Sequence, residues 1–472
     1  MKEVRHLIGG EWVPGDGMEH PVLDKFRGVP VATFRNAGTR QVEAAVAMAH
    51  AAFAAGAPVA HLRGHILQEA SRLVGDRAEE FVGLMRQEAG FPRSDALGEV
   101  RRCMETLRLS AEEARRFCGD VLPLEGAPDQ GERMGFTLRV PLGVVAAITP
   151  FNSPMNTVAH KIGPAFAAGN AVVLKPSTHT PMTACLLGEL LVQAGIPRGF
   201  LSVLHGGADT VQTLQSQESV RFFAFTGSTE VGRIIQQAAG LRRTQMELGS
   251  IACTIVCADA DLDRALPKIV NAAYRKAGQV CTSIQLLLVQ SQIAQRVEQE
   301  LSRRVRDLAF GDPSNEHTVV GPLISEEAAQ RVGGWITEAL ALGARRLAGG
   351  DRVGSVVPPT LLANVDARMK VGCQEVFGPV MCLVPFDSLE DAFDRVNATP
   401  YGLATGIFTH RLSDALLAAR RLQVGGVHVN ETSSSRVDLM PYGGSKSSGF
   451  GREGPHYAIR EMSEERVVTI SS

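Results

Sequence analysis

The feature that most constrains the fold of this chain is an alternation of strand-type and helix-type segments between Gly143 and Gly240. Residues 144–149 form an apolar run, as expected for a parallel strand buried on both faces. A helix is expected over 155–168, closed by the C-terminal cap signal Gly169-Asn170, with a second strand over 171–174. The cycle continues with a helix from Thr180 to Gly195, a strand at 201–204, a helix at 209–215, a strand at 222–225 and a helix at 228–239. This pattern predicts a doubly wound α/β sheet, whose ligands sit beyond the carboxyl ends of the strands.

The rest of the chain predicts further parts. A second α/β region runs from about 248 to 426, with helical patterns at 261–277 and 293–308. Prolines and glycines break the helical pattern in 118–140, and the tail 464–472 has the pattern of a short strand. A chain of 472 residues exceeds the size at which one hydrophobic core keeps growing, so two or more domains are expected.

Composition argues against several classes of function. With 44% hydrophobic and 21% charged residues, the chain is an ordinary globular protein. Its net charge of −2 gives no case for nucleic acid, which attracts a concentrated basic surface. The Arg-rich stretch 101–116 is better interpreted as an amphipathic helix. The buried face of that helix is expected to carry Leu97, Val100, Met104, Leu107, Ala111 and Ala114.

Signals for a membrane, for export and for a metal are not found either. The apolar run 144–148 is far shorter than a membrane span, and residues 1–6 lack the apolar core of a secretory signal. The 8 cysteines show no close Cys-x-x-Cys pair, and no His/Cys/Asp cluster has ligand spacing, so no metal site is expected. We therefore expect a cytoplasmic protein with free thiols and no membrane partner.

Two residues carry the first indication of chemistry. Cys281 follows a helix-type segment and has small neighbours in Ala277-Gly278-Gln279-Val280-Cys281-Thr282, which leaves room for a carbonyl group to approach the sulfur. Upstream, Glu247 could activate either the thiol or a water. Taken alone, these residues are better explained as a cysteine that packs in the core and a glutamate on the surface.

Further motifs fit the same chemistry. They are Thr149-Pro150-Phe151-Asn152-Ser153-Pro154, Leu174-Lys175-Pro176-Ser177, Phe225-Thr226-Gly227-Ser228, Glu375-Val376-Phe377-Gly378-Pro379 and Pro441-Tyr442-Gly443-Gly444-Ser445-Lys446. In this order, with Glu247 and Cys281 between them, the set resembles the NAD(P)-dependent aldehyde dehydrogenase superfamily across most of the chain. The run Arg436-x-Asp438-x-Met440-Pro441 resembles the branch that includes lactaldehyde and phosphonoacetaldehyde dehydrogenases, which favours a short substrate.

The resemblance implies an α/β, aldehyde dehydrogenase-like fold in three parts. A Rossmann-type dinucleotide-binding domain would comprise 1–117 and 141–247, and a second α/β domain, the catalytic one, 248–447. A small β element formed by 118–140 and 455–472 would be the oligomerisation element of a homodimer or homotetramer.

The resemblance also assigns catalytic roles. Cys281 would attack the aldehyde to give a thiohemiacetal, which becomes a thioester on loss of hydride. Glu247 would be the general base for the thiol or for the water that hydrolyses the thioester. Asn152 would donate its side-chain amide to the oxyanion, together with the backbone N–H of Cys281; otherwise an asparagine at a strand exit only caps a turn. Many members continue the glutamate motif with Gly-Gly-Lys, whereas this chain has Gly249-Ser250-Ile251, which puts the local loop in doubt.

The cofactor is expected to be NAD, with NADP tolerated. By resemblance, Lys175 would bind the adenosine ribose, Glu375 the nicotinamide ribose, and Phe377 would pack near the nicotinamide. Relatives strict for NAD often carry a glutamate where this chain has Thr178, so no carboxylate here repels a 2′-phosphate. No Gly-x-Gly-x-x-Gly fingerprint is present, and the nearest equivalent is the helix start at 227–232, which could receive the diphosphate. The remaining predicted cofactor ligands are Ser177, Gly227, Ser228 and Leu248.

Three basic residues, Arg102, His160 and Arg436, occupy positions where the resembled family lines its substrate tunnel. Members acting on hydrophobic aldehydes tend to have bulky aromatic residues there, whereas this chain is only 5% aromatic. We predict a small-molecule aldehyde that is short and polar or anionic, because a guanidinium suits a carboxylate, phosphate, phosphonate or sulfonate. The structural alternatives are a contact of Arg436 with Asp438, a His160 satisfied in the core, and Arg102 paired with Glu99 or Glu105.

Two rival functions fit the same fold. A CoA-acylating dehydrogenase would resolve the thioester with CoA instead of water, but that branch usually lacks the carboxylate seen here as Glu247. A non-catalytic binding protein on the same scaffold would not need the complete set of catalytic and cofactor motifs. We therefore predict oxidation of the aldehyde to its carboxylic acid by NAD(P).

Overall fold

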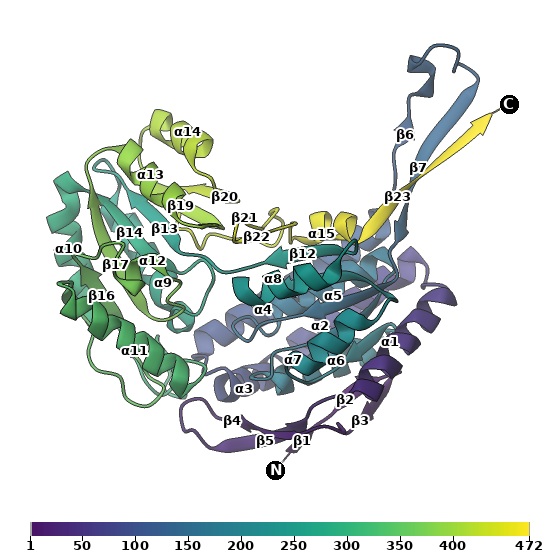
Figure 1. Ribbon diagram of the computed structural model, residues 1–472, viewed down its shortest axis with the longest axis horizontal. Coiled ribbons are helices and arrows are strands. Elements are labelled where there is room, and N and C mark those ends of the chain that lie inside the picture. The colour runs from purple at the N-terminus through teal and green to yellow at the C-terminus, as the bar shows by residue number, and fades with distance from the viewer. Residues whose placement is uncertain (1, 472) are drawn as a thin grey trace.

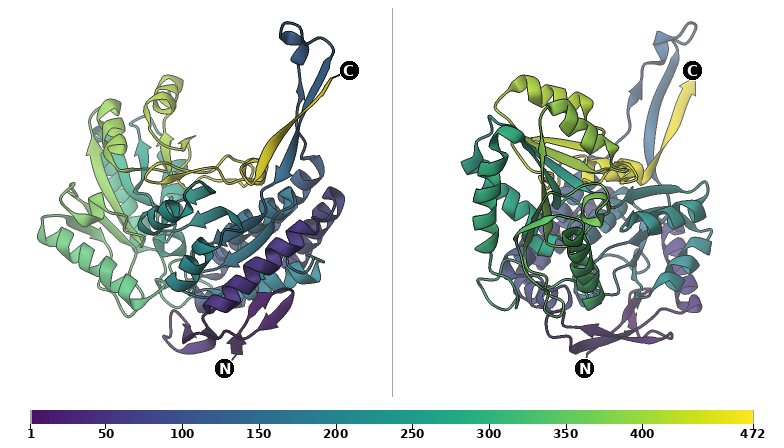
Figure 2. Two further views of the ribbon diagram at one scale, coloured as in Figure 1. Left: turned by 45° about the vertical axis from the view of Figure 1, so that its right-hand side comes forward. Right: turned by 60° about the vertical axis from the view of Figure 1, so that its left-hand side comes forward.

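The computed structural model describes residues 2–471 and has two lobes, each built on one large sheet, with a slender arm projecting from the body (Figure 1). The arm stands away from the body in the two further views as well (Figure 2). The α/β architecture predicted from the sequence is confirmed. Among the described residues, no helix has the length and apolar character needed to span a membrane.

The sheet of the first lobe has a parallel centre. Its strands, in spatial order, are β22 (Gly449–Phe450), β12 (Arg243–Glu247), β11 (Val220–Thr226), β8 (Val144–Ile148), β9 (Ala171–Lys175), β10 (Leu201–Val203), β2 (His6–Ile8) and β3 (Glu11–Val13). Strands β8 to β12 run parallel, and the three others pair antiparallel. The chain order reverses at β8, because β9 and β10 extend the sheet on one side of it and β11 and β12 on the other. Doubly wound sheets bind ligands at such a switch point.

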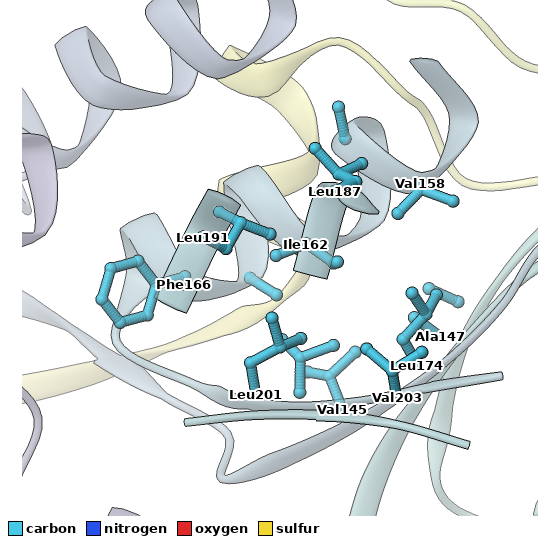
Figure 3. Packing of buried hydrophobic residues seen from close by; sticks show 14 of the residues in the cluster. Val145, Ala147, Val158, Ile162, Phe166, Leu174, Leu187, Leu191, Leu201 and Val203 are labelled. Atoms are coloured by element: carbon cyan, nitrogen blue, oxygen red, sulfur yellow. The ribbon is translucent and has the colours of Figure 1, made fainter. Parts of the chain in front are cut away.

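Helices cover both faces of this sheet. They are α5 (Asn156–Ala168), α6 (Pro181–Gln193), α7 (Ala208–Ser216) and α8 (Thr229–Ala239). Because right-handed crossovers run in opposite directions from β8, α5 and α6 lie on one face and α7 and α8 on the other. Figure 3 shows Ile162 of α5 and Leu187 of α6 packed over Val145 and Val203. The additional helices of this lobe are α1 (Thr39–Ala54), which packs on α7, and α2 (Ala60–Asp76), α3 (Ala78–Glu88) and α4 (Arg93–Arg116), which form an outer layer over α5 and α6.

Local sequence explains these elements. All five residues of β8 are buried, which accounts for its unbroken apolar run. Helix α5 is buried around its whole circumference because it lies between the sheet and α4. It ends at Gly169, whose φ of 98° is left-handed and suits a glycine cap. The Arg-rich helix predicted over 101–116 is α4, which begins earlier, at Arg93.

The second lobe is a second α/β layer with hydrophobic cores of its own. The strands of its sheet, in spatial order, are β15 (Arg345–Ala348), β16 (Thr360–Ala363), β17 (Val380–Phe386), β14 (Ile284–Gln290), β13 (Ala252–Val256), β19 (Ala404–Phe408) and β20 (Gly426–Val429). All neighbours are parallel except β15 with β16. The helices are α9 (Leu262–Tyr274), α10 (Ser291–Arg306), α11 (Glu326–Ala341), α12 (Lys370–Cys373), α13 (Leu389–Ala398) and α14 (Leu412–Arg421).

The arm joins two segments that are far apart in the sequence. It consists of β6 (Val121–Leu122), η1 (Leu124–Gly126), β7 (Arg133–Pro141) and the C-terminal β23 (Ser463–Ser471), which follows α15 (Pro455–Glu461). Strand β23 pairs antiparallel with β7 along its whole length, so the strand expected in the tail is present. Smaller strands are β1 (Lys2–Val4), β4 (Glu19–Leu23) and β5 (Pro30–Arg35) in one sheet, and β18 (Tyr401–Gly402) with β21 (Ser445–Lys446) in another.

Candidate active site

A cavity of about 550 Å³ lies between the two lobes, at the switch point of the first sheet. Of the residues predicted to act on substrate or cofactor, those in its wall are Arg102, Asn152, Gly227, Ser228, Glu247, Leu248, Cys281, Glu375, Phe377 and Arg436. Lys175 closes β9, and Ser177 and Thr178 follow it, outside this lining. His160 is fully buried behind the wall. The structure therefore gathers most of the predicted site in one place.

The sulfur of Cys281 faces two polar groups. It lies 3.3 Å from Oε1 of Glu247 and 3.1 Å from the hydroxyl oxygen of Tyr442. Glu247 is the last residue of β12 and is only 5% exposed. Burial and the neighbouring Glu453 raise the pKa of Glu247 to about 7, and burial also raises the pKa of the Cys281 thiol. A carboxylate with a pKa near neutrality, in contact with a thiol, has the geometry and basicity of a general base.

A strained turn, η2 (Arg275–Gly278), leads from α9 to Cys281. The helix predicted over 261–277 was three residues too long, because Lys276 and Ala277 have φ angles of 51° and 54°, which side chains rarely adopt. Gly278 continues the left-handed run with φ 68°. A Cβ there would lie 2.1 Å from the carbonyl oxygen of Gly378, so only glycine fits this close approach.

Lys276 ties this turn to the first lobe. Its ammonium lies 2.7 Å from the carboxylate of Glu99 and donates to the carbonyl oxygen of Asn152 at 2.8 Å. The lysine thereby holds the segment before Cys281 against the exit of β8. None of the described residues hydrogen-bonds the side-chain amide of Asn152, which lines the cavity and is free to donate to a ligand.

The cofactor end of the cavity is built from both lobes. Glu375 accepts a hydrogen bond from the backbone N–H of Ser250 at 2.8 Å, and a Cβ at Gly249 would lie 2.5 Å from that carboxylate. The departure from the Gly-Gly-Lys pattern thus leaves the loop able to hold Glu375. Burial raises the pKa of Glu375 to about 7. Phe377, with φ 47°, stands edge-on to Phe151, their ring centroids 5.9 Å apart.

The remaining predicted cofactor residues suit an anionic dinucleotide. Burial lowers the pKa of Lys175 to about 8, and no carboxylate of the described chain lies within ion-pair distance of its ammonium. Ser228 caps α8 by accepting from the N–H of Val231 at 3.3 Å. The first turn of α8 thus begins in the wall of the cavity, where the positive end of a helix favours phosphate.

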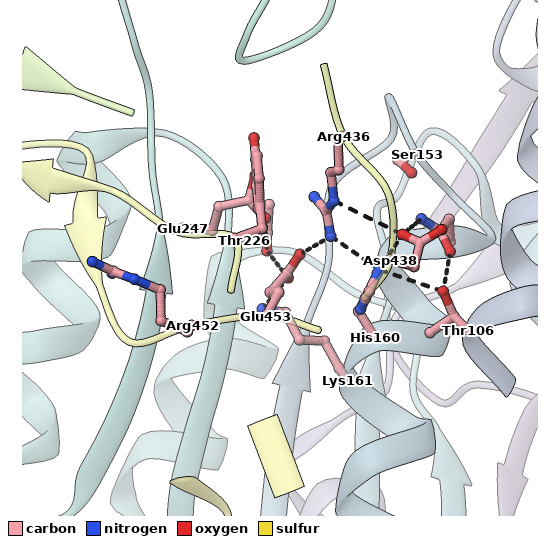
Figure 4. Close-up of polar contacts among 12 residues, drawn as sticks. Thr106, Ser153, His160, Lys161, Thr226, Glu247, Arg436, Asp438, Arg452 and Glu453 are labelled. Atoms are coloured by element: carbon pink, nitrogen blue, oxygen red, sulfur yellow. Dashed lines mark hydrogen bonds and ion pairs between the residues drawn. The ribbon is translucent and has the colours of Figure 1, made fainter. Parts of the chain in front are cut away.

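Carboxylates behind the cavity wall pair with basic residues that were predicted to line the substrate tunnel, as Figure 4 shows for Arg436. Arg436 lies 2.8 Å from Glu453, which also lies 2.7 Å from the buried Lys161. Although burial acts against it, Lys161 and Arg436 hold the pKa of Glu453 well below its ordinary value. The hydroxyl oxygen of Thr226 lies 3.5 Å from Glu453 and 3.3 Å from Glu247. Its single proton can be donated to either carboxylate, so the base and this ion-paired carboxylate share one donor.

Asp438 is the second neutralising carboxylate. Its carboxylate forms an ion pair with the guanidinium of Arg102 at 2.6 Å and lies 2.8 Å from Nε2 of His160. Arg102 is therefore paired with Asp438, and not with Glu99 or Glu105 as the alternative proposed. His160 is buried in the core and paired there through Nε2, whereas its Nδ1 has no hydrogen-bond partner among the described residues, and burial lowers its pKa. Because His160 has no surface in the cavity, we assign it a structural role, which is to hold the side chain of Asp438 in place.

Two arginines in the wall were not singled out from the sequence. Arg275 donates only a long hydrogen bond, 3.4 Å, to the hydroxyl of Ser434. Arg331 lies over the ring of Trp335 at 4.9 Å, near Glu375. Among the residues that the structure describes, no carboxylate lies within ion-pair distance of either arginine. The only sequence signal for Arg275 was its position just before the Cys281 motif, which does not distinguish it from Lys276.

Comparison with known proteins agrees with this geometry. The model of the Aldehyde dehydrogenase family matches residues 12–468. The chain belongs to this family. A 3-sulfolactaldehyde dehydrogenase of Priestia aryabhattai is 44% identical over 473 residues, covering 100% of this chain and 98% of the relative. The oxidoreductase class and the NAD(P) dependence of the present chain follow from its membership of the family.

Solved structures of the family have the same fold. Aldehyde dehydrogenase 21 from Physcomitrella patens, in complex with the reaction product succinate, has a TM-score of 0.97 and 34% identity, covering 100% of this chain and 98% of its own. An NADP-dependent glyceraldehyde-3-phosphate dehydrogenase from Bacillus halodurans, complexed with NADP, has a TM-score of 0.96 and 32% identity, with 100% of both chains covered. The fold of this aldehyde dehydrogenase is therefore that of its family along the whole chain.

Proposed function

We propose that this aldehyde dehydrogenase oxidises a short aldehyde with an anionic tail to the carboxylic acid, through a covalent thioester on Cys281 that is hydrolysed with Glu247 as base. The observation that carries the proposal is the 3.3 Å contact between the thiol and the Glu247 carboxylate inside the cavity. The chemistry below follows from that contact.

In the first step Glu247 takes the thiol proton and the sulfur of Cys281 attacks the carbonyl carbon of the aldehyde. The π electrons move to the carbonyl oxygen, where the free amide of Asn152 donates a hydrogen bond. Such donors act on charge that exists only along the reaction, so they lower the barrier more than they tighten binding. Lys276 supports this step indirectly by fixing the backbone of Asn152.

The residues proposed to hold the cofactor come from both lobes. Lys175, Ser177, Thr178, Gly227, Ser228, Leu248, Glu375 and Phe377 would hold NAD or NADP, which supplies the hydride acceptor that turns the thiohemiacetal into a thioester. Glu247 releases the thiol proton to solvent and then removes a proton from water, whose oxygen attacks the thioester carbonyl. The C–S bond breaks to give the acid and the Cys281 thiolate, which takes a proton back from Glu247. Because the pKa of Glu247 is about 7, the base is active above that pH and is progressively protonated below it.

The anionic tail is inferred from Arg275. A half-buried guanidinium without a carboxylate partner favours a ligand that brings a negative charge. Arg102 and Arg436 line the same cavity, but Asp438 and Glu453 already balance their charge. One relative is a 3-sulfolactaldehyde dehydrogenase and another was solved with the reaction product succinate, and both support an anionic group at the far end of the substrate.

Self-association is part of the proposal. The arm exposes apolar side chains on a narrow, extended element, which is costly for an isolated monomer. These residues are Val121, Met134, Leu138, Val467 and Ile470. We infer that the arm mediates a homodimer or homotetramer.

The test is rapid mixing of purified protein with cofactor and a four-carbon aldehyde that carries a terminal carboxylate. Native protein should reduce cofactor continuously, and Cys281→Ala should bind cofactor but reduce none. Glu247→Gln should reduce about one equivalent of cofactor, more slowly than native protein, and then stall: the thiol must lose its proton to solvent, and hydrolysis of the thioester lacks a base. An acyl adduct on the Cys281 peptide, detected by mass spectrometry, should accompany the stall.

Other outcomes decide between the rivals. Turnover by Cys281→Ala would refute the covalent route, and unchanged steady-state rates in Glu247→Gln would place the base elsewhere. Release of the stalled acyl group on adding CoA, with no effect of Glu247→Gln in its presence, would instead support the CoA-acylating alternative.

A further inference from the structure

Tyr442 contacts the reactive sulfur and has no part in the mechanism given above. Its hydroxyl oxygen lies 3.1 Å from Sγ of Cys281, closer than the 3.3 Å of the Glu247 carboxylate. Within residues 2–471, these two groups are the hydrogen-bond partners of that sulfur. A phenol and a carboxylate thus both contact the nucleophile.

The hydrogen-bond inventory fixes the direction of the contact. A thiol has one proton, and that of Cys281 points to the Glu247 carboxylate, which can only accept while it is ionised. The hydroxyl of Tyr442 is then the donor and the sulfur the acceptor. Burial and the nearby Cys281 and Glu247 raise the pKa of Tyr442, so its proton stays in place at neutral pH.

The surroundings of Tyr442 hold the hydroxyl in position. Its backbone N–H donates to the carbonyls of Met440 at 2.9 Å and Glu453 at 3.2 Å, and its carbonyl accepts from the N–H of Glu453 at 2.6 Å. The guanidinium of Arg436 lies over the ring, 3.7 Å from the centroid. A cation on the ring face is attracted to the π electrons and withdraws electron density from the phenol, which makes its O–H a better donor.

We propose that Tyr442 is a fourth catalytic residue, beside Cys281, Glu247 and Asn152, whose hydroxyl donates a hydrogen bond to the sulfur of Cys281 and stabilises the thiolate that attacks the aldehyde. The inference rests on the proposed function, in which Cys281 is the nucleophile. In this step the S–H bond breaks, the proton goes to Glu247, the S–C bond forms and the carbonyl π pair moves to oxygen. Tyr442 keeps its own proton, and its hydrogen bond weakens once the sulfur loses its charge to the new bond.

The test follows the thiol in the absence of any aldehyde. Alkylation of Cys281 by iodoacetamide is timed across the neutral and alkaline pH range, and the Cys281 peptide is quantified by mass spectrometry. In Tyr442→Phe the reaction should be about tenfold slower at each pH below the thiol pKa, since one hydrogen bond to a charged group is worth at least one pKa unit. This readout needs no turnover, so it can fail while dehydrogenase activity, and with it the proposed function, stands.

A matched control is available at Tyr274. That residue is fully buried, and its hydroxyl donates to the carbonyl of Thr360 at 3.0 Å, away from the thiol. Tyr274→Phe should alkylate at the native rate. Equal rates in Tyr442→Phe and native protein would overturn the proposal, and so would an equal slowing in both variants, which would signal a general loss of structure.

A second substitution keeps the test valid if Tyr442→Phe fails to fold. Incorporation of 3-fluorotyrosine at position 442 retains the ring and gives a more acidic hydroxyl, which is a stronger donor. Alkylation of Cys281 should then be faster than in native protein at the same pH. An unchanged or slower rate, in protein that still binds cofactor, would refute a donor role for Tyr442.

Discussion

Charge in the wall of the cavity is balanced side chain by side chain. Arg436 and Arg102 meet the carboxylates of Glu453 and Asp438, and Lys276 meets Glu99. Removing one partner from such buried pairs leaves an uncompensated charge, which is strongly destabilising. Of the described residues that line the cavity, Arg275 and Arg331 have no such partner, which makes them the groups available to ligands.

Arg275→Met tests this point at the scale of one residue. The variant keeps an unbranched apolar side chain but loses the guanidinium. For an aldehyde with a terminal carboxylate, kcat/KM should fall about 30-fold, as expected for the loss of a hydrogen bond to a charged group worth about 2 kcal/mol. For a matched neutral aldehyde the change should be severalfold smaller. Both are measured by steady-state reduction of the cofactor.

The control for Arg275→Met is Arg264→Met, at an exposed arginine in the first turn of α9, the helix that ends just before Arg275. This variant should leave both substrates unaffected. If Arg275→Met lowers kcat/KM equally for charged and neutral aldehydes, the guanidinium does not bind the tail and the anionic-substrate proposal is wrong.

At the scale of elements, periodicity predicted the first lobe closely. Strands β8 and β9 and helices α5 and α6 fall where the apolar runs and the cap at Gly169 place them, since these signals are local. The end of α9 was missed because the left-handed turn at Lys276 depends on remote partners. Those partners, Glu99 and the carbonyl of Gly378, approach only in the folded chain.

The candidate site shows the same division between what local sequence predicts and what depends on remote contacts. The motifs identified Cys281 and Glu247, and the structure places the two side chains in contact. The sequence also indicated a cationic tunnel, but it could not show that Asp438 and Glu453 neutralise Arg102 and Arg436. Arg102 and Asp438 are 336 residues apart, and Arg436 and Glu453 are 17 apart. Both pairs form only through the tertiary fold, and neither composition nor spacing carries that information.

Self-association can be tested by a substitution in the arm. Val467 of β23 is 60% exposed in the single chain, and a neighbouring subunit would cover it. Val467→Glu places a charge there, and burying an unpaired charge at an interface is unfavourable. Size-exclusion chromatography with light scattering should find native protein as a dimer or tetramer and the variant as a smaller species.

An exposed valine outside the arm provides the control for the arm variant. Val353, in a loop of the second lobe, is 79% exposed, and Val353→Glu should retain the native mass. A native protein that is monomeric at the same concentration would contradict the homo-oligomer. A native mass in Val467→Glu would place the interface away from this part of the arm.

At the scale of the whole molecule, the residues proposed to bind the cofactor come from both lobes. Lys175 and Ser228 belong to the first sheet and its helix, whereas Glu375 and Phe377 belong to the second lobe. A ligand that contacts both lobes binds only when they are folded and in register. Binding linkage then stabilises the protein by about 2.7 kcal/mol when the ligand is present at about 100 times its Kd.

Thermal unfolding with and without cofactor measures this linkage. NAD should raise the Tm of native protein by several degrees, and NADP should also raise it, because Thr178 places no carboxylate against a 2′-phosphate. Glu375→Gln keeps the shape of the side chain but removes the charge facing the ribose, so the shift caused by NAD should be smaller. Glu390→Gln, at an exposed glutamate of α13, should keep the native shift. An undiminished shift in Glu375→Gln would show that the second lobe contributes no binding energy through this carboxylate, and would exclude Glu375 from the cofactor site.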